Sequence, residues 1–438
     1  MKDCYKENEL GDQIQVHCSH QRFPNHPHEY RRMPCNAPLL VRVNRSGGKS
    51  KYEPRFLYAY QPIKQSLQRL LKIPGFEEKL EHWRTRESVP HVLSDVYDGN
   101  VWQDFQTEKF SFFLKTRRSI GFMLNLDFFQ PFKHVQQSYG VIYLTIMNLP
   151  RSERFKQKNV LIVGVIPPFE HEPESMNTFL TPLVDELQEF WNPGVCLYTY
   201  RSPWFRLNYK AALMCVACDI PASRKCCGFK GHSANYGCNR CQKFFPGGFG
   251  KKDCSGFDRS TWPQRNLTAH RSTCTELQKC TTTSAVEQLQ TETGVKYSAL
   301  IELTYFDPIR FTIIDPIHNL FLGTGKYVMK KLWVEKGILS PEQLKIIQQR
   351  VDSYPAPHGM GRIPRKIATS FGGFTAEQWK NWIILYSMFA LRGILPDNHY
   401  KCWQTFALAC FFLCRRAITD TDLLKADHLL IKFCESIE

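Results

Sequence analysis

The sequence has few acidic residues for its length. Its 438 residues include 41 Asp and Glu against 57 Lys and Arg, which gives a formal net charge of +16. This excess of basic residues favours a polyanionic partner, and nucleic acid is the commonest one, because neutralised phosphates release their counterions. A basic protein without any polyanionic partner is equally compatible with the charge alone.

Long apolar runs are also missing. The N-terminal residues contain no apolar stretch of the kind that forms a signal peptide. The most apolar windows, 139–149 and 407–413, are shorter than the roughly 20 residues that cross a membrane. We find no internal repeat. We therefore expect no membrane partner, and a location in the nucleus, or in the cytoplasm before import.

Cysteine, in contrast, is abundant. Seventeen cysteines without a secretory signal indicate reduced thiols, some of them holding metal, rather than a disulfide framework. The hydrophobic fraction of 43% is sufficient for a packed core. A chain of this length exceeds what one core usually supports, so we expect one large domain with insertions, or two domains.

Four apolar runs predict β-strands, and a helix is expected before the last of them. Such continuous apolar runs are typical of strands covered by helices on both faces. Asp127 and Asp219 end the first and the fourth run. This order predicts an α/β fold with an RNase H-like mixed sheet flanked by helices, a Cys-rich insertion and a helical C-terminal part. The strands are expected at 120–127, 139–147, 160–166 (closed by Pro167 and Pro168) and 211–219, and the buried face of the helix at Phe179, Leu180, Leu183, Val184, Leu187, Phe190 and Trp191.

The predicted organisation has five parts. A Cys/His-rich segment, interpreted as an irregular or truncated zinc module, is followed by a helical linker region in which Leu67, Leu70 and Leu71 share a face. The first part of the catalytic core comes next, then a Cys-rich, loop-rich inserted module. A strand at 310–315, a helix from Pro316 and further helices complete the core. The boundaries are expected at 1–50, 51–118, 119–222, 223–305 and 306–438.

Asp127 and Asp219 form the first candidate site. Phosphodiester cleavage with paired metal ions needs carboxylates that hold the ions about 3.5–4 Å apart. Mg²⁺ prefers a few carboxylates together with water and phosphate oxygens. Acids at matching ends of neighbouring strands would supply such a site for Mg²⁺ or Mn²⁺. The alternative is that each acid merely ends a strand or caps the following turn.

Asp315 and His318 form a second feature. Asp as N-cap with Pro316 at the first helical position is an ordinary helix start. His318 lies one turn further on, on the same side as Asp315. We therefore expect the pair to begin a helix and to order the site as well.

The close spacing of His232, Cys238 and Cys241 suits tetrahedral zinc, which takes imidazole and thiolate ligands. A fourth ligand is missing from the motif, and Cys226, Cys227 and Cys254 are candidates for it. Buried cysteines without metal are the alternative. A second, weaker set fits no zinc spacing: Cys18, His20, His26, His28 and Cys35.

Basic residues interleaved with aromatic ones mark a stretch that would track a DNA backbone. Lys251, Lys252 and Arg265 are the principal candidates, with Trp262 and Arg271 nearby. A solvated surface is the equally plausible alternative.

Several of these motifs, in this order, resemble the catalytic domain of CACTA (En/Spm-type) DNA transposases. The resemblance covers roughly residues 95–415. It rests on NLDFFQPF at 125–132, MNLP at 147–150, VIPP at 165–168, CDIPA at 218–222, GHSANYGCNRC at 231–241 and DPIHNLFLG at 315–323.

The resemblance implies an Asp-Asp-Glu/Asp triad in which Asp127 and Asp219 are the first two acids. Residues 375–379 (TAEQW) are similar to an acidic-Gln-Trp element of the family, so Glu377 is expected to be the third. The residues after it, Trp379, Trp382 and Ile383 among them, are apolar at helical spacing, so this helix is expected to pack on the sheet and present Glu377 to the other two acids. The implied activity is cleavage of double-stranded DNA at transposon ends, followed by transfer of the 3′-hydroxyls to a target. The remaining rivals for the third acid are Glu302, Asp307 and Glu335.

Two other hypotheses stay open. One is a domesticated or decayed, non-catalytic DNA-binding protein derived from a transposase, since no separate end-recognising DNA-binding module is recognisable. The other is a zinc-scaffolded protein-interaction module, which would leave the strand-end acids unexplained. A transposase would act as a homo-oligomer or with an accessory protein of the same element.

Overall fold

The structure is a computed structural model in which the chain forms two compact units. The sheet unit comprises Met1–Glu81, Thr116–Lys252 and Pro263–Thr312, and the helical unit comprises His82–Lys115, Asp253–Trp262 and Ile313–Glu438. Each unit is assembled from segments far apart in sequence. The structure describes residues 5–7, 13–15, 17–21, 23, 34–44, 50–107, 112–115, 117–132, 134, 137–169, 173, 175–248, 251–256, 258–354 and 361–437.

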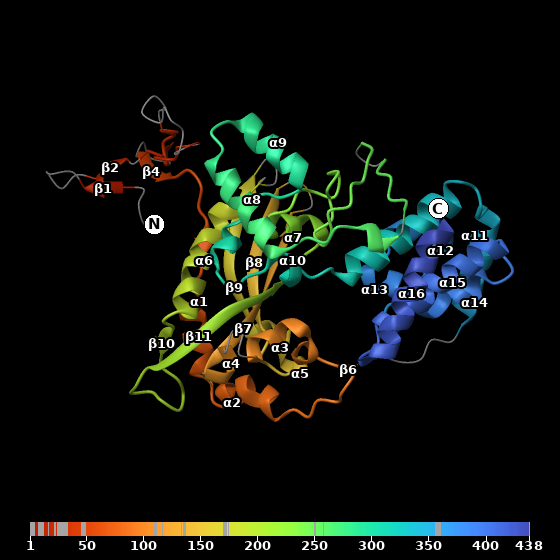
Figure 1. Cartoon of the computed structure of the whole chain (residues 1–438), viewed down its shortest axis with the longest axis horizontal. Coiled ribbons are helices and arrows are strands. Elements are labelled where there is room, and N and C mark those ends of the chain that lie inside the picture. Colours follow the sequence, from red (N-terminus) through yellow and green to blue (C-terminus); the bar gives the residue numbers. More distant parts are fainter. Residues whose placement is uncertain are drawn as a thin grey trace. The chain divides into compact units, whose positions relative to one another are not determined.

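The sheet unit is built on a six-stranded mixed sheet, so the molecule is of the α/β class (Figure 1). Neighbouring strands run antiparallel except β11 and β7, which run parallel. The sheet order is β10 (Val195–Leu197), β11 (Leu207–Val216), β7 (Ser119–Phe129), β8 (Ser138–Ile146), β9 (Val160–Phe169) and β5 (Ala59–Tyr60).

The four strands and the helix expected from the apolar runs are confirmed. Helix α6 (Asn177–Trp191) lies between β9 and β11 in sequence and packs against β11. All of its predicted core residues are buried except Trp191, which is half-buried. Helix α1 (Ile63–Leu71) likewise buries Leu67, Leu70 and Leu71, and it ends before Pro74.

The expected end of the third strand at Pro167 is wrong, because β9 continues to Phe169. The β8–β9 register shifts between Gly140, which pairs with Ile166, and Ser138, which pairs with Phe169. The two prolines lie within this irregularity. Proline is tolerated in a sheet at such places because it has no N–H to donate to the ladder.

The interpretation of residues 223–305 as loop-rich is also corrected. Two sizeable helices occupy this stretch, α8 (Leu267–Lys279) and α9 (Thr283–Thr293). The expected strand at 310–315 is replaced by a helical turn, α10, and Thr312 alone makes a parallel bridge to Val216. The other elements of the sheet unit are β1 (Tyr5–Glu7), β2 (Gln13–Gln15), β3 (Leu40–Asn44), β4 (Ser50–Pro54), α2 (Phe76–Glu81), α5 (Arg151–Arg154), α7 (Ile220–Cys227) and α10 (Pro308–Phe311).

The helical unit has its own core, in which Trp333, Trp379, Trp382 and Trp403 are almost fully buried. The helix expected from Pro316 is present as two consecutive π-helical segments, η7 and η8. The elements are β6 (Val92–Leu93), α3 (Asn100–Gln106), α4 (Phe112–Lys115), η7 (Ile317–Gly325), η8 (Val328–Val334), α11 (Pro341–Ser353), α12 (Ile367–Ser370), α13 (Ala376–Asn381), η10 (Trp382–Tyr386), α14 (Ser387–Leu391), α15 (Asp397–Leu413), β12 (Ile418–Thr419) and α16 (Asp420–Ile437).

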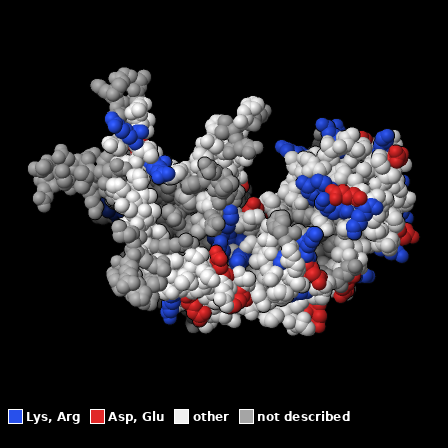
Figure 2. All heavy atoms as spheres, turned by 90° about the horizontal axis from the view of Figure 1, so that it is seen from above, with Lys and Arg blue, Asp and Glu red and all other residues white. Residues whose placement is uncertain are grey.

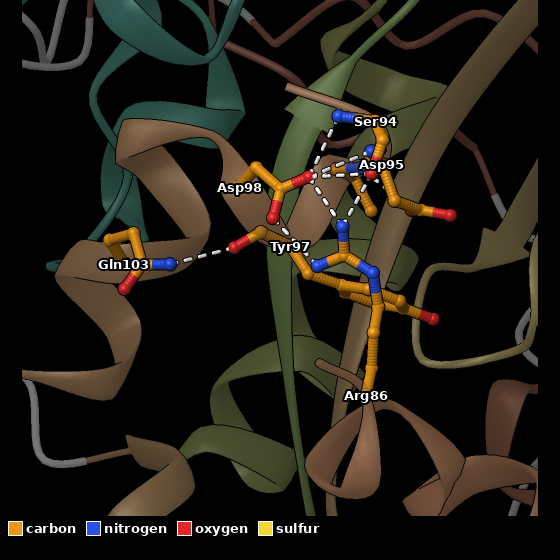
Figure 3. A network of polar contacts seen from close by, with 7 residues as sticks. Arg86, Ser94, Asp95, Tyr97, Asp98 and Gln103 are labelled. Atoms are coloured by element: carbon orange, nitrogen blue, oxygen red, sulfur yellow. Dashed lines mark hydrogen bonds and ion pairs between the residues drawn. The ribbon is translucent and has the colours of Figure 1, made fainter. Parts of the chain in front are cut away.

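An ion-pair network stabilises the N-terminal segment of the helical unit (Figure 3). Arg86 Nη1 and Nη2 donate to the two carboxylate oxygens of Asp98 at 2.6 and 2.7 Å. The backbone N–H groups of Ser94 and Asp95 donate to the same carboxylate. Burial opposes the ionisation of Asp98, but these donors outweigh it and hold the pKa of the carboxyl below its usual range.

None of the helices in the described part of the chain is long and apolar enough to span a membrane.

Candidate functional site

Asp127 lies near the end of β7 and is exposed, in register with Val141 of β8. The residues before it on β7, from Ser119 to Leu124, are all buried. The strand therefore carries the carboxylate of Asp127 out of the apolar interior, near the C-terminal end of β7. The nearby Tyr143 has a raised pKa, caused first by burial and then by the negative charge of Asp127.

Asp219 follows β11 and caps helix α7. Its Oδ1 accepts a hydrogen bond from the backbone N–H of Ala222 at 2.8 Å, and Pro221 occupies the first turn. The capping role weighed from the sequence is thus real. It does not exclude a metal-binding role, because a carboxylate has two oxygens and several lone pairs.

The two acids lie at the same end of neighbouring parallel strands. Leu126 N donates to Cys218 Sγ at 3.1 Å, and Asn125 Nδ2 donates to the carbonyl of Ala217 at 2.5 Å. Asp127 and Asp219 each stand one residue beyond the Leu126–Cys218 contact. Parallel strands are about 4.8 Å apart, so this connection brings the backbones that carry the two carboxylates together.

Cys218 and Asn125 are contributors that the sequence analysis did not single out. Cys218 is buried, and its thiol also contacts Cys226 at the other end of α7. That contact, followed by burial, raises the pKa of the Cys226 thiol. Asn125 and Cys218 thus connect the ends of the two strands that carry the acids. Their positions, two residues before Asp127 and one residue before Asp219, are the signal by which they could have been found.

Glu377 belongs to the helical unit and lies in the first turn of α13, half exposed. The expectation that its helix packs on the sheet is wrong. The residues after Glu377 that were predicted to be apolar, Trp379, Trp382 and Ile383 among them, are buried in the core of the helical unit. The helix that carries Glu377 therefore packs against the tryptophan-rich helices of its own unit.

The rival acids have structural partners. Glu302 accepts a hydrogen bond from Tyr297 Oη at 2.5 Å, and Asp307 caps α10 through the N–H groups of Ile309 and Arg310. Glu335 pairs with Lys331 at 2.8 Å on the surface of the helical unit.

Asp315 and His318 meet as expected from their spacing. Asp315 Oδ1 accepts the N–H of Ile317 at 2.8 Å, and Oδ2 lies 2.5 Å from His318 Nδ1. Asp315 thus begins the helix and orients the imidazole at once. Segment η7, which carries His318, packs against α13, which carries Glu377. The helical unit therefore brings these two elements side by side.

Cys238 and Cys241 form a tight turn in which the Cys238 sulfur accepts backbone N–H groups from Arg240 at 3.3 Å and from Cys241 at 3.4 Å. The two thiols also contact each other. Such a turn presents both sulfurs to one side. His232 is exposed a few residues earlier. Among the described residues, no group of three or more His, Cys, Asp or Glu side chains is arranged to hold a metal ion.

Arg265 does not contact DNA from the surface, and that prediction is corrected. Its side chain is buried, and the guanidinium donates to the carbonyls of Cys238, Cys241, Thr293 and Tyr236 at 2.8 to 3.2 Å. A buried guanidinium needs such acceptors to offset its lost hydration.

Arg271 is used in the same way, because its guanidinium donates to the carbonyls of Ile301, Leu303 and Phe306. Lys252 donates to Asn235 Oδ1 at 2.5 Å, and Lys251 is exposed. The second set of Cys and His residues weighed as zinc ligands lies near the N-terminus. Its members His26 and His28 lie outside the described residues, whereas Cys18, His20 and Cys35 are described.

The surface charge is interspersed rather than gathered. Over the described atoms of the face in Figure 2, Lys and Arg side chains alternate with Asp and Glu and form no unbroken basic track.

Part of the chain matches a known protein family. Residues 91–246 match the family model described as transposase family tnp2, and no curated protein matches the chain. The matched stretch includes Asp127, Asp219 and the Cys238–Cys241 turn, and it ends before Asp315 and Glu377. The chain is therefore similar to transposases over the part that holds both strand-end acids, which supports a transposase-derived function and, in general terms, DNA binding.

Proposed function

We propose that the chain is the catalytic part of a DNA transposase of the CACTA class, with an RNase H-like core. The observation that supports the proposal is the position of Asp127 and Asp219 at the same end of two neighbouring parallel strands. Three antiparallel strands, a crossover helix and a strand that joins parallel to the first give the order expected of that core. The tnp2 match covers the same stretch.

The carboxylates of Asp127 and Asp219 fit a divalent cation that is bound together with a phosphate. Mg²⁺ is commonly held by one or two carboxylates, with water and phosphate oxygens completing its shell. A bound Mg²⁺ or Mn²⁺ would activate the attacking oxygen and stabilise charge on the phosphate. Asp127 contributes an exposed carboxylate, and Asp219 contributes one that its hydrogen bond to Ala222 N holds in a fixed orientation.

In the proposed reaction a water oxygen first attacks the phosphorus at a transposon end, and the 3′-oxygen of the cleaved strand leaves. The oxygen of that 3′-hydroxyl then attacks the phosphorus of a target phosphodiester, loses its proton and displaces the 3′-oxygen of the target strand. Glu377 is proposed as the third acid, with His318, held by Asp315, ordering the site. Zinc is proposed at the Cys238–Cys241 pair, in a structural role.

Strand cleavage by the purified full chain tests the function. Wild-type protein with Mg²⁺ or Mn²⁺ should nick DNA that carries the transposon end, and Asp127→Asn and Asp219→Asn should each lower the rate by at least about a thousandfold. DNA binding should be retained, since phosphate contacts come from other residues. Cleavage at the wild-type rate by either variant would overturn the proposal. DNA binding by a wild-type chain that does not cleave would favour the decayed, non-catalytic alternative.

A further inference from the structure

The connection between β10 and β11 carries the two most exposed large apolar side chains among the described residues. Trp204 is 84% exposed and Phe205 is 75% exposed. Six of the nine tryptophans are buried and two are half-buried, so Trp204 is the single exposed one. Packing within the sheet unit does not account for these two side chains. Exposed apolar surface concentrated in one place usually marks a contact site.

This connection, residues 198–206, is held in a defined conformation. Ser202 N donates to Thr199 Oγ1 at 3.0 Å, and Ser202 Oγ donates to the carbonyl of Phe205 at 2.7 Å. Tyr200 N donates to the carbonyl of Leu71, which ties the connection to α1. The rings are thus positioned before a partner arrives, which lowers the entropy lost on binding.

The charge of the connection suits an anionic partner. Residues 198–206 include Arg201 and Arg206 and no acidic residue. Arg201 is paired with Glu78. Arg206 is exposed and lies over the ring of Tyr198, 5.0 Å from its centroid. Flat aromatic faces beside an exposed arginine are the combination that proteins use to bind single-stranded nucleic acid.

We propose that residues 198–206, the aromatic loop, bind unpaired DNA by stacking bases on Trp204 and Phe205 while Arg206 contacts the phosphates. Stacking tolerates any sequence, because every base has an aromatic face. The loop and Asp219 lie at opposite ends of β11 (Figure 1, lower left for the loop). The ten residues of β11, at about 3.3 Å each, separate the loop from Asp219 by about 30 Å. The aromatic loop is therefore distinct from the site of Asp127 and Asp219. The proposal rests on DNA as the partner of the proposed function, and it does not require cleavage.

Fluorescence anisotropy with the full chain tests this contact. The probes are a labelled 12-nucleotide thymidine strand, a strand of equal length whose central nucleotides are abasic, and a duplex. The wild-type chain should bind the thymidine strand at least about tenfold more tightly than the abasic one. Trp204→Ala and Phe205→Ala should each weaken binding of the thymidine strand about tenfold, within the range that stacking of one base supports, and leave the abasic strand little changed.

Phe155→Ala is the matched control, because Phe155 is a 62% exposed aromatic side chain elsewhere in the sheet unit. It should bind all three probes as the wild type does. Because the assay measures binding and not cleavage, a failure of the loop is separated from a failure of catalysis. Equal binding of the thymidine and abasic strands by the wild type would overturn the proposal. So would a loop variant that binds DNA normally but loses self-association in sedimentation, which would assign the loop to a second copy of the chain.

Discussion

At the scale of single residues, an arginine can bind DNA phosphates or stabilise the fold through backbone carbonyls, and the sequence alone does not distinguish the two roles. Arg265 stands among basic and aromatic residues, as a phosphate-contacting arginine would. Its three guanidinium nitrogens nevertheless donate to four backbone carbonyls at and near the Cys238–Cys241 turn. Only the folded chain shows those carbonyls converging, since Tyr236 and Thr293 lie far apart in sequence.

Replacement of Arg265 should therefore affect stability rather than DNA binding. Arg265→Met leaves several buried carbonyls without donors, and we expect the free energy of unfolding to fall by about 3 kcal/mol or more. Urea unfolding followed by circular dichroism measures this. Lys251→Met, an exposed lysine of the same stretch, is the control and should change stability by less than about 0.5 kcal/mol. A loss of DNA affinity at unchanged stability in Arg265→Met would contradict this assignment.

At the scale of elements, apolar runs predicted the strands and helices that bury many consecutive or periodic residues. They did not predict the helices that bury few residues. The buried segments of β7, β8, β9 and β11 and the apolar stripe of α6 gave strong signals. Helix α8 buries only His270, Cys274 and Leu277, and α9 has no buried residue among those described. Their capping residues were the available signal: Asn266 accepts from Ala269 N, and Thr282 accepts from Ala285 N.

The Cys238–Cys241 turn is the element for which a metal is expected. The Cys238 sulfur accepts two backbone N–H groups, which hold the turn in a fixed conformation with both cysteines close together. We expect purified protein to contain about one zinc ion per chain. Cys238→Ser with Cys241→Ser should remove that zinc and lower the melting temperature, since structural zinc contributes folding free energy.

Elemental analysis of the wild type and the double variant gives the answer, and Cys280→Ser, a half-buried cysteine elsewhere in the same unit, serves as the control. An unchanged zinc content in the double variant would exclude the turn as the site.

At the scale of the whole molecule, the interleaving of the two units lay beyond sequence reasoning. The contiguous boundaries expected at residues 119–222 and 306–438 do not show that 82–115 and 253–262 join the helical unit. That assignment depends on contacts between distant segments, such as the ion pair of Arg259 with Asp427 and the bridge of β6 with β12. Periodicity describes the face that an element buries, and it does not identify the element against which that face packs.

Glu377 belongs to the helical unit, whereas Asp127 and Asp219 belong to the sheet unit. Glu377 lies in the first turn of α13 behind a capping box of Thr375 and Gln378. Glu342 lies in the first turn of α11 behind the same kind of box, formed by Ser340 and Gln343. Each carboxylate gains the same favourable interaction with its helix dipole. The two glutamates thus occupy the same position of a capped helix start, although Glu377 also lies 3.9 Å from Arg362.

Glu377→Gln should therefore abolish Mg²⁺-dependent cleavage of transposon-end DNA, and Glu342→Gln should cleave at about the wild-type rate. Both variants should lose the same small part of the helix-terminus stabilisation, about 0.3–1 kcal/mol, which thermal unfolding measures. DNA binding should be unchanged in both, because phosphate contacts do not depend on a metal-binding carboxylate. Wild-type cleavage by Glu377→Gln would reject it as the third acid, and the same comparison would then pass to Glu302, Asp307 and Glu335. Equal losses of cleavage in both variants would show that the helix start, and not the carboxylate at Glu377, is what the reaction requires.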